Sequence, residues 1–484
     1  MANKQDVLEE ILAEFEKLTQ IPRKSGHEEK VSNYLRDRLT GLGFTVVQDE
    51  KFNIIADKPA SAGCEKAPLT VLQGHMDMVC VAAPGVKFDP LTDAIKLKRG
   101  KKYLEADGTS LGADDGIGVA EAIYIMRTLE NHGPLRLIVT VDEEQGMTGA
   151  IHLDAKYLTD ASFLINCDSE NYDELTVGSA GSVNIDFSRK MQQQAPQQKK
   201  AWKLSVKDLL GGHSGERIGD GRGNAIRTAA MALLSLQEKE IAFELADFQG
   251  GTARNAIPAS AEVVFASDAS EKELQAVVAE TKERFVEMYG GVDPEAKLLL
   301  SATEAPAQVF AAADTAALLQ LLIALHTGVY AMSQVIPGLV ETSANLGVIH
   351  TQAGTVTIQF FPRSAIDAKT DEFRRMAQAY AAMSGFAAQI GTQSPGWKER
   401  KDSRLARIMA ETFQEQNGSP MKVETIHAGL ECGWHFRKNP KLDMVSIGVT
   451  TMDIHSPNEK LLLETVEPQA ALIMETLRKI AAMK

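Results

Sequence analysis

Acidic and histidine side chains follow several strongly apolar segments of the chain, and such a pattern could hold metal ions. The segment APLTVLQGHMDMV ends with His75 and Asp77, which strand geometry with a period of two places on the same face. In such a pair the imidazole can bind a metal while the carboxylate orients the ring. A histidine at a loop end beside a capping aspartate gives the same pattern, so this pair alone does not decide between the two.

Two further segments carry adjacent acids. TSLGADDGIG places Asp114 and Asp115 within a glycine-rich turn at the start of a predicted helix, where helix capping accounts for one acid but not for both. VTVDEEQG places Asp142, Glu143 and Glu144 directly after an apolar strand. Like charges this close repel unless a cation or solvent relieves them. One glutamate could therefore bind a metal while its neighbour acts as a general base, and a solvated loop is the alternative.

Two more candidates lie further along the chain. Asp168 follows the apolar run FLINC, and His455 follows DMVSIGV. Each of these acids and histidines therefore lies just beyond the C-terminal end of a predicted strand, which is the edge where open α/β sheets bind ligands. Their recurrence at one edge favours a metal site.

The elements that must position these residues alternate between helical and strand-like patterns. Residues 1–181 and 397–484 show this alternation and predict an α/β domain. Between them, residues 182–396 contain a weak internal echo, GGTARNAIPASAEVVFA followed by ETSANLGVIHTQAGTVTIQFFPRS. We therefore expect a catalytic domain split around an inserted α/β lid built from two related halves.

Composition narrows the class of protein. The 484 residues are 44% hydrophobic and 24% charged, which is typical of a globular protein with more than one domain. A net charge of -14 without a basic cluster argues against nucleic-acid binding, and the absence of a long apolar stretch argues against a membrane partner. The scattered cysteines, without CxxC spacing, and the lack of a signal peptide predict a soluble cytoplasmic protein.

Eight motifs occur in order along the chain: GHMDMV, LGADDGIG, DEEQGMTGA, NCDSE, GGHSG, GGTARNAIP, HAGLECG and DIHSP. Together they closely resemble the aminoacyl-histidine dipeptidases, also called Xaa-His or cytosol non-specific dipeptidases, of the aminoacylase and glutamate-carboxypeptidase superfamily of co-catalytic zinc peptidases. The resemblance implies a zinc-exopeptidase-like catalytic domain with a central mixed sheet, and an inserted lid that also serves dimerisation. It therefore also implies a homodimer.

The same resemblance implies two divalent metal ions, zinc or in its place manganese or cobalt. His75 and Asp168 would bind one ion, and Glu144 and His455 would bind the other. Asp114 would bridge the two, and a cis peptide would join it to the following residue.

The resemblance also assigns catalytic roles. Glu143 would be the general base that takes a proton from a metal-activated water, and Asp77 would orient His75. His213 in GGHSG would stabilise the oxyanion, in its own subunit or in a partner.

Three further residues would bind the substrate. Asn255 and Arg363 match a substrate-binding pair, with Arg363 suited to the carboxylate of a dipeptide, and Glu431 in HAGLECG would line the pocket. Without the resemblance, His213 and Asn255 would be turn residues and Arg363 a surface charge on a strand.

The expected substrates are dipeptides with a free amino end, including Xaa-His types such as β-alanyl-histidine, because related enzymes with aspartate at the position of Asp168 are dipeptidases or aminopeptidases. The nearest alternative is an amidohydrolase acting on N-acyl amino acids. A non-catalytic metal-binding scaffold would not need Glu143 beside the ligands. A nucleotide-binding enzyme is disfavoured because LGADDGIG has acids where a phosphate would bind.

Overall fold

The computed structural model describes residues 4–483, and the chain divides into two compact units. The first unit comprises Met1–Ser179, Trp397–Thr425 and Leu430–Lys484. The second comprises Ala180–Gly396 and Ile426–Gly429.

The first unit is built on an eight-stranded sheet with the order β1-β2-β6-β3-β7-β21-β8-β20. Its strands are β1 (Thr45–Gln48), β2 (Ile54–Lys58), β6 (Leu135–Thr140), β3 (Thr70–His75), β7 (Phe163–Asn166), β21 (Asp443–Ser446), β8 (Glu174–Ser179) and β20 (Lys422–Ile426). Strand β3 is parallel to β6 and β7, and β21 is parallel to β7, whereas β2 is antiparallel to β1 and β6. The predicted α/β fold with a mixed central sheet is therefore confirmed.

The four central strands explain the apolar runs in the sequence. Every residue of β3, β6, β7 and β21 is buried. Parallel strands read as nearly continuous apolar segments because helices cover both of their faces. The parallel arrangement also brings the C-terminal ends of these strands to one edge, where the predicted chemistry is placed.

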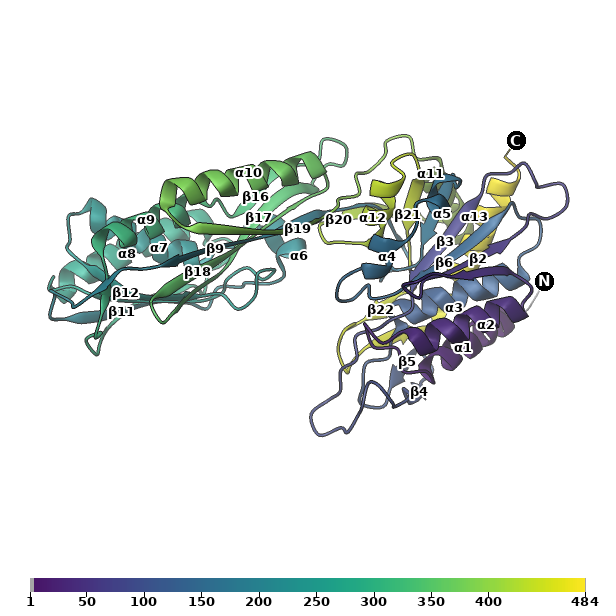
Figure 1. The fold of residues 1–484 in the computed structure, drawn as a ribbon, viewed down its shortest axis with the longest axis horizontal. Helices are drawn as coiled ribbons and strands as arrows, with labels where there is room; N and C mark the ends of the chain where they lie inside the picture. Colours follow the sequence, from purple (N-terminus) through teal and green to yellow (C-terminus); the bar gives the residue numbers. More distant parts are fainter. Residues whose placement is uncertain (1–3, 484) are drawn as a thin grey trace. The chain divides into compact units, whose positions relative to one another are not determined.

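Helices and a small sheet complete the first unit. Figure 1 shows α1 and α3 lying side by side, and α3 also contacts β3 and β6. The helices are α1 (Lys4–Thr19), α2 (Glu29–Gly41), α3 (Ala113–Thr128), α4 (Thr148–His152), α5 (Lys156–Thr159), α11 (Arg404–Asn417), α12 (Glu431–Lys438) and α13 (Val466–Ala481). The small sheet contains β22 (Thr451–Met452), β23 (Lys460–Leu462), β5 (Tyr103–Ala106) and β4 (Leu97–Arg99).

The second unit has an antiparallel sheet with the order β14-β11-β13-β12-β17-β18-β9-β19, and β16 pairs with β17. Its strands are β9 (Gly181–Lys190), β11 (Ala201–Lys207), β12 (Glu244–Gly250), β13 (Ala261–Ala266), β14 (Lys297–Thr303), β16 (Gly328–Met332), β17 (Val340–Gln352), β18 (Thr355–Ser364) and β19 (Ala387–Ser394). A short separate pair is formed by β10 (Gln193–Gln194) and β15 (Val309–Phe310).

Four longer helices pack on this sheet around one apolar core. They are α7 (Ala225–Glu238), α8 (Glu271–Tyr289), α9 (Ala312–Ala324) and α10 (Asp367–Ser384), and α6 (Ser214–Arg217) is a single turn. The order α7-β12-β13-α8-β14 is matched by α9-β17-β18-α10-β19, with β16 added beside β17. This repeated order supports the proposal that the unit consists of two related halves.

The short segment Ile426–Gly429 groups with the second unit although it lies within the C-terminal part of the chain. It is held there by His427, whose Nε2 atom is 2.7 Å from Ser343 Oγ on β17. The HAGLECG motif is therefore divided, with His427 in the second unit and Glu431 in the first.

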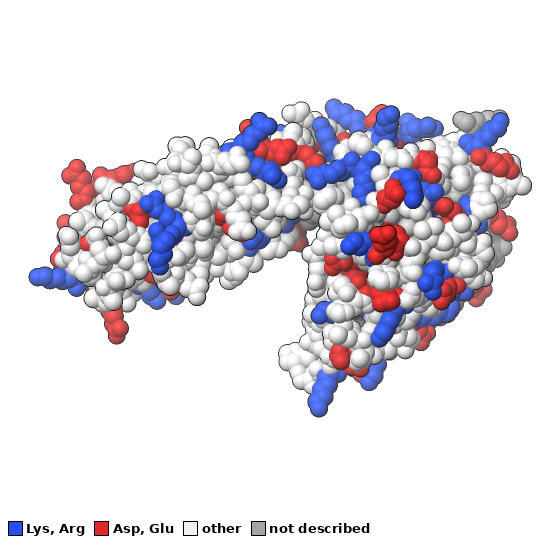
Figure 2. All heavy atoms as spheres, in the orientation of Figure 1, with Lys and Arg blue, Asp and Glu red and all other residues white. Residues whose placement is uncertain are grey.

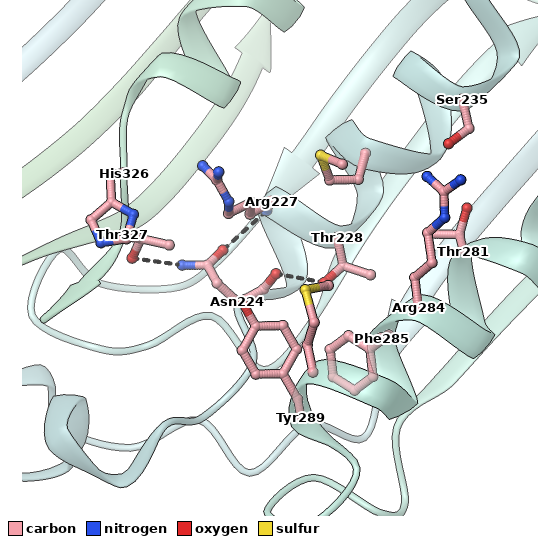
Figure 3. A pocket seen from close by; sticks show the side chains of 12 residues that line it. Asn224, Arg227, Thr228, Ser235, Thr281, Arg284, Phe285, Tyr289, His326 and Thr327 are labelled. Atoms are coloured by element: carbon pink, nitrogen blue, oxygen red, sulfur yellow. Dashed lines mark hydrogen bonds between the residues drawn. The ribbon is translucent and has the colours of Figure 1, made fainter. Parts of the chain in front are cut away.

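The second unit contains a cavity of about 230 Å³ beside α7 and α8 (Figure 3). At one end of it Asn224 caps α7, accepting a hydrogen bond from the N–H of Arg227 at 3.1 Å and donating one to Thr327 Oγ1 at 3.4 Å. Phe285 and Tyr289 of α8 line its apolar part. None of the residues predicted to do chemistry lines this cavity.

The surface carries charges of both signs. Figure 2 shows basic side chains interspersed with acidic ones on the visible face of the first unit. None of the helices within residues 4–483 combines the length and the hydrophobicity of a membrane span.

Candidate metal centre

The five predicted metal ligands lie together at the C-terminal edge of the parallel strands. His75 is the last residue of β3, Glu144 follows β6, Asp168 follows β7, Asp114 lies in the first turn of α3, and His455 is in the loop between β22 and β23. The ligand atoms of His75, Asp114 and Glu144 all lie within 4.8 Å of one another. The parallel pairing of β3 with both β6 and β7 accounts for this convergence.

Asp114 occupies the middle of the group. Its Oδ1 atom is 3.1 Å from His75 Nε2, and its Oδ2 atom is 3.0 Å from His455 Nε2. Asp168 lies on the His75 side, with Oδ1 3.4 Å from Nε2, and Glu144 lies on the His455 side, with Oε2 2.9 Å from Nε2. The Asp114 carboxylate thus lies between two pairs of potential metal ligands, one containing His75 and the other containing His455. This arrangement is required for one carboxylate to be shared between two cations.

The electrostatics of this edge favour bound cations. Burial raises the pKa of Asp168 well above its usual range, and the nearby Asp114 carboxylate contributes further. Hydrogen bonds to Asp114 and Glu144 raise the pKa of His455 to about 10. Burial by itself lowers the pKa of His75, but Asp168 and Asp114 outweigh it and raise that pKa well above the ordinary value. Negative charge is therefore concentrated here, and imidazole with carboxylate donors fits zinc, manganese or cobalt.

Asp77 is fully buried and connects two parts of the centre. One of its oxygens lies 3.3 Å from His75 Nδ1. Its carboxylate also accepts hydrogen bonds from the backbone N–H of Glu143 at 3.0 Å, from the N–H of Glu144 at 3.3 Å, and from Ser25 Oγ at 2.8 Å. It can therefore orient the imidazole, as the sequence predicts, and also hold the turn that carries both glutamates.

Asp115 binds the backbone of the predicted metal ligand His75. The peptide bond between Asp114 and Asp115 is cis. The Asp115 carboxylate accepts a hydrogen bond from the backbone N–H of His75 at 3.1 Å. A Cβ atom on Gly74 would lie 2.1 Å from one Asp115 oxygen, and a Cβ on Gly118 would lie 2.2 Å from the other. These two glycines are therefore needed to make room for the carboxylate.

Glu431 lies in the first unit and is hydrogen-bonded to residues of two central strands. Its side chain is fully buried at the start of α12, and its role in lining the substrate pocket stays a prediction. Its Oε2 atom accepts hydrogen bonds from Gln73 Nε2 at 2.5 Å and from Thr140 Oγ1 at 2.7 Å, and burial raises its pKa to about 7. These hydrogen bonds connect the start of α12 to β3 and β6.

The remaining predicted residues lie in the second unit. His213 precedes α6 and is partly exposed, and burial together with the charge of Arg363 lowers its pKa. Arg363 is buried on β18, where its guanidinium lies 4.6 Å from the centre of the Phe361 ring, so it is not a surface charge. Asn255 is exposed, and its backbone carbonyl accepts a hydrogen bond from the backbone N–H of Ser214 at 2.7 Å.

His427 is a residue that the sequence reasoning missed. It is buried beside Ser343, and burial together with the charge of Arg363 lowers its pKa to about 3. A Cβ on Gly215 would lie 2.8 Å from both the His213 ring and the His427 carbonyl. The second unit therefore groups these two histidines with Arg363. The sequence did contain an indication of His427, because it is the first residue of the HAGLECG motif.

Removal of metal should weaken the first unit, because the crowded carboxylates would lose the cations that offset their repulsion. We expect zinc at 100 times its Kd to stabilise the metal-free protein by about 2.7 kcal/mol, measured as a rise in Tm. Asp114→Asn should lose most of this gain, whereas Asp107→Asn, on the exposed surface of the same unit, should keep it. An equal Tm with zinc and with a chelator would contradict the assignment.

Comparison with known proteins places this geometry in a family. The profile described as Peptidase family M20/M25/M40 matches residues 71–479. The chain is 35% identical over 472 residues to the cytosol non-specific dipeptidase of Escherichia coli (strain K12), covering 97% of each protein. Its fold matches the crystal structure of the aminoacylhistidine dipeptidase of Vibrio alginolyticus with a TM-score of 0.91 and 34% identity, covering 97% of this chain and 96% of that one.

A more distant match shows the fold alone. A tripeptidase from Staphylococcus aureus superposes with a TM-score of 0.56 at 18% identity, covering 100% of both chains. The resemblance drawn from the eight sequence motifs is confirmed by the closer matches. The chain belongs to Peptidase family M20/M25/M40.

Proposed function

We propose that this peptidase hydrolyses dipeptides with a free amino end, including Xaa-His types such as β-alanyl-histidine, and that it uses two divalent cations. The observation that carries the proposal is the position of Asp114, whose two oxygens face His75 on one side and His455 on the other. The names of the Escherichia coli and Vibrio alginolyticus relatives support dipeptides as the substrate class.

The cations would be divided between two sets of donors. His75 with Asp168 would hold one, Glu144 with His455 would hold the other, and Asp114 would be shared. Zinc fits this donor set, with manganese or cobalt as substitutes. When bound, such cations acidify water and polarise the carbonyl that is attacked.

Glu143 is the proposed general base. It is adjacent to the ligand Glu144, and the hydrogen bond from its N–H to Asp77 fixes its backbone beside the centre. From this position its carboxylate takes a proton from the attacking water and returns it to the leaving amine. The same Asp77 side chain orients His75, so the base and one ligand share a single anchor.

Residues of the second unit would bind the substrate ends. The buried Arg363 guanidinium lies over the Phe361 ring, and its Nε atom has no hydrogen-bond partner among residues 4–483. A planar donor that is already oriented suits bidentate capture of the dipeptide carboxylate. His213, whose lowered pKa keeps it neutral near pH 7, would donate to the oxyanion, and Asn255 would contact the substrate beside it.

Two wider properties complete the proposal. We infer a homodimer from the family resemblance, with the second unit as its dimerisation region. All four cysteines are free, which supports a reducing cytoplasmic location, as does the name of the Escherichia coli relative.

Glu143→Gln should reduce kcat by roughly 10²- to 10⁴-fold, because the water would lose its proton acceptor while every metal ligand remains. Metal content, measured by elemental analysis, should stay unchanged. Glu50→Gln, an exposed carboxylate of the same unit, serves as the control and should retain full activity. Unchanged turnover in Glu143→Gln would remove this residue from the role.

Arg363→Met should lower kcat/KM for free dipeptides by roughly 10- to 150-fold, the loss expected when a charge-assisted hydrogen bond is removed. The same variant should no longer distinguish a dipeptide from its C-terminal amide, because the amide lacks the carboxylate that Arg363 would bind. Arg374→Met, a partly exposed arginine on α10, is the control. Equal discrimination in Arg363→Met and in the wild type would exclude this contact.

The substrate class can be tested directly with the wild-type protein. Free-amine dipeptides and N-acetyl amino acids should be compared at equal concentration in the presence of zinc, manganese or cobalt. We expect hydrolysis of the dipeptides and little of the acylated amino acids. The reverse preference would identify a deacylase.

A further inference from the structure

Two buried charged side chains outside the predicted ligand set contact the turn that carries Asp114. Arg23 is 2% exposed and Glu459 is 3% exposed. They lie at opposite ends of the chain and approach the same turn, residues 111–114. Burying an arginine or a glutamate costs several kcal/mol unless hydrogen bonds compensate, so their contacts indicate what holds them there.

Glu459 binds the N–H groups at the start of α3. Its Oε2 atom accepts from the N–H of Leu111 at 2.7 Å and of Gly112 at 3.0 Å, and its Oε1 atom accepts from the N–H of Ala113 at 2.8 Å and of Asp114 at 3.4 Å. The first N–H groups of a helix have no partner within the helix, and a carboxylate there is favourable. One side chain therefore fixes the backbone of four successive residues, including Asp114.

Arg23 binds carbonyl groups of the same turn and of the segment after β3. Its Nη2 atom donates to Gly112 O at 2.5 Å, and its Nη1 atom donates to Met76 O and Asp77 O, both at 3.0 Å. The guanidinium therefore joins the Asp114 turn to the residues that directly follow His75. Because its donors are fixed in one plane, it sets the spacing between the two segments.

The glycines of LGADDGIG reflect this contact. A Cβ atom on Gly112 would lie 2.5 Å from Arg23 Nη2, and a Cβ on Gly116 would lie 2.6 Å from the same atom. Gly112 also has a φ of 70°, which glycine adopts most readily. These glycines therefore allow a buried guanidinium to lie directly against the turn.

Glu459 also connects the turn to His455. It lies four residues after His455, and its own N–H donates to Ser456 O at 3.3 Å. Three of the proposed ligands, His75, Asp114 and His455, are thus held relative to one another through Arg23 and Glu459. The Glu459 carboxylate binds the N–H groups of the turn, and the Arg23 guanidinium binds one of its carbonyl groups.

We propose that Arg23 and Glu459 are positioning residues that set where Asp114 lies between the two histidines, and so determine how tightly the second cation binds. This inference rests on the two-metal centre of the proposed function. It assigns no contact with substrate to either residue. A shared ligand is sensitive to position, because displacing it toward one cation draws it away from the other.

Cobalt binding to the full-length protein tests the inference. Arg23→Lys and Glu459→Gln are compared with Arg127→Lys and Glu10→Gln, a matched pair from an exposed ion pair of the same unit. Affinity and stoichiometry are measured by calorimetry, and ligand geometry is followed by the visible absorption of Co²⁺. We expect the two test variants to bind the second Co²⁺ at least about tenfold more weakly and to shift the absorption bands. The matched pair should behave as the wild type.

Arg23→Met separates geometry from charge. Lysine keeps the charge but offers one nitrogen in place of the two that donate to these three carbonyls, so Arg23→Lys and Arg23→Met should show the same loss of the second Co²⁺. Thermal unfolding of the metal-free variants identifies those that fold. If the variants at one of the two positions do not fold, the variant at the other position still tests the inference, because Arg23 and Glu459 each contact the turn through their own side chain.

Folded variants with wild-type stoichiometry, second-site affinity and cobalt spectrum would overturn the inference and leave a purely structural role. A wild-type protein that binds two Co²⁺ ions but hydrolyses no dipeptide would overturn the proposed substrate class and leave this inference standing. A wild-type protein that binds no Co²⁺ would overturn both.

Discussion

Repulsion between carboxylates at one sheet edge is the constraint on which the rest of the first unit depends. Asp114, Glu144 and Asp168 lie around two imidazoles within a few ångströms. Charges this close favour the protein only when cations or protons lie among them. The surrounding structure must therefore hold these side chains against their own repulsion.

The protein meets this demand with a second set of polar groups that bind the backbone of the ligand-bearing turns. Asp77 binds the N–H groups of Glu143 and Glu144, and Asp115 binds the N–H of His75. Beneath them, hydrogen bonds run across neighbouring strands from Thr140 through Glu431, Gln73 and Asn166 to Ser446. The strand ends are thus linked to one another by side chains as well as by the sheet.

The residues proposed for the chemistry of this peptidase belong to two separately packed units. The first unit holds the proposed metal ligands and the base, and the second groups His213, Arg363 and His427. The HAGLECG motif contributes to both, because its histidine packs with the second unit while its glutamate is buried in the first. A single short motif therefore serves two different structural purposes.

The sequence by itself determined the α/β fold and indicated the residues that could bind metal. Those residues follow apolar segments, and parallel strands bring their ends to one edge, so a local pattern was enough to predict that His75 and Asp168 converge. It did not reveal the contacts of Arg23 and Glu459 with the Asp114 turn, or the hydrogen bonds that hold Glu431. Arg23 and its partner Gly112 are 89 positions apart in the sequence, and Glu459 and Leu111 are 348 positions apart. Glu431 and Gln73 are 358 positions apart. Only the tertiary structure decided these contacts, because a buried charge can be paired only by whatever the packing of distant segments brings against it.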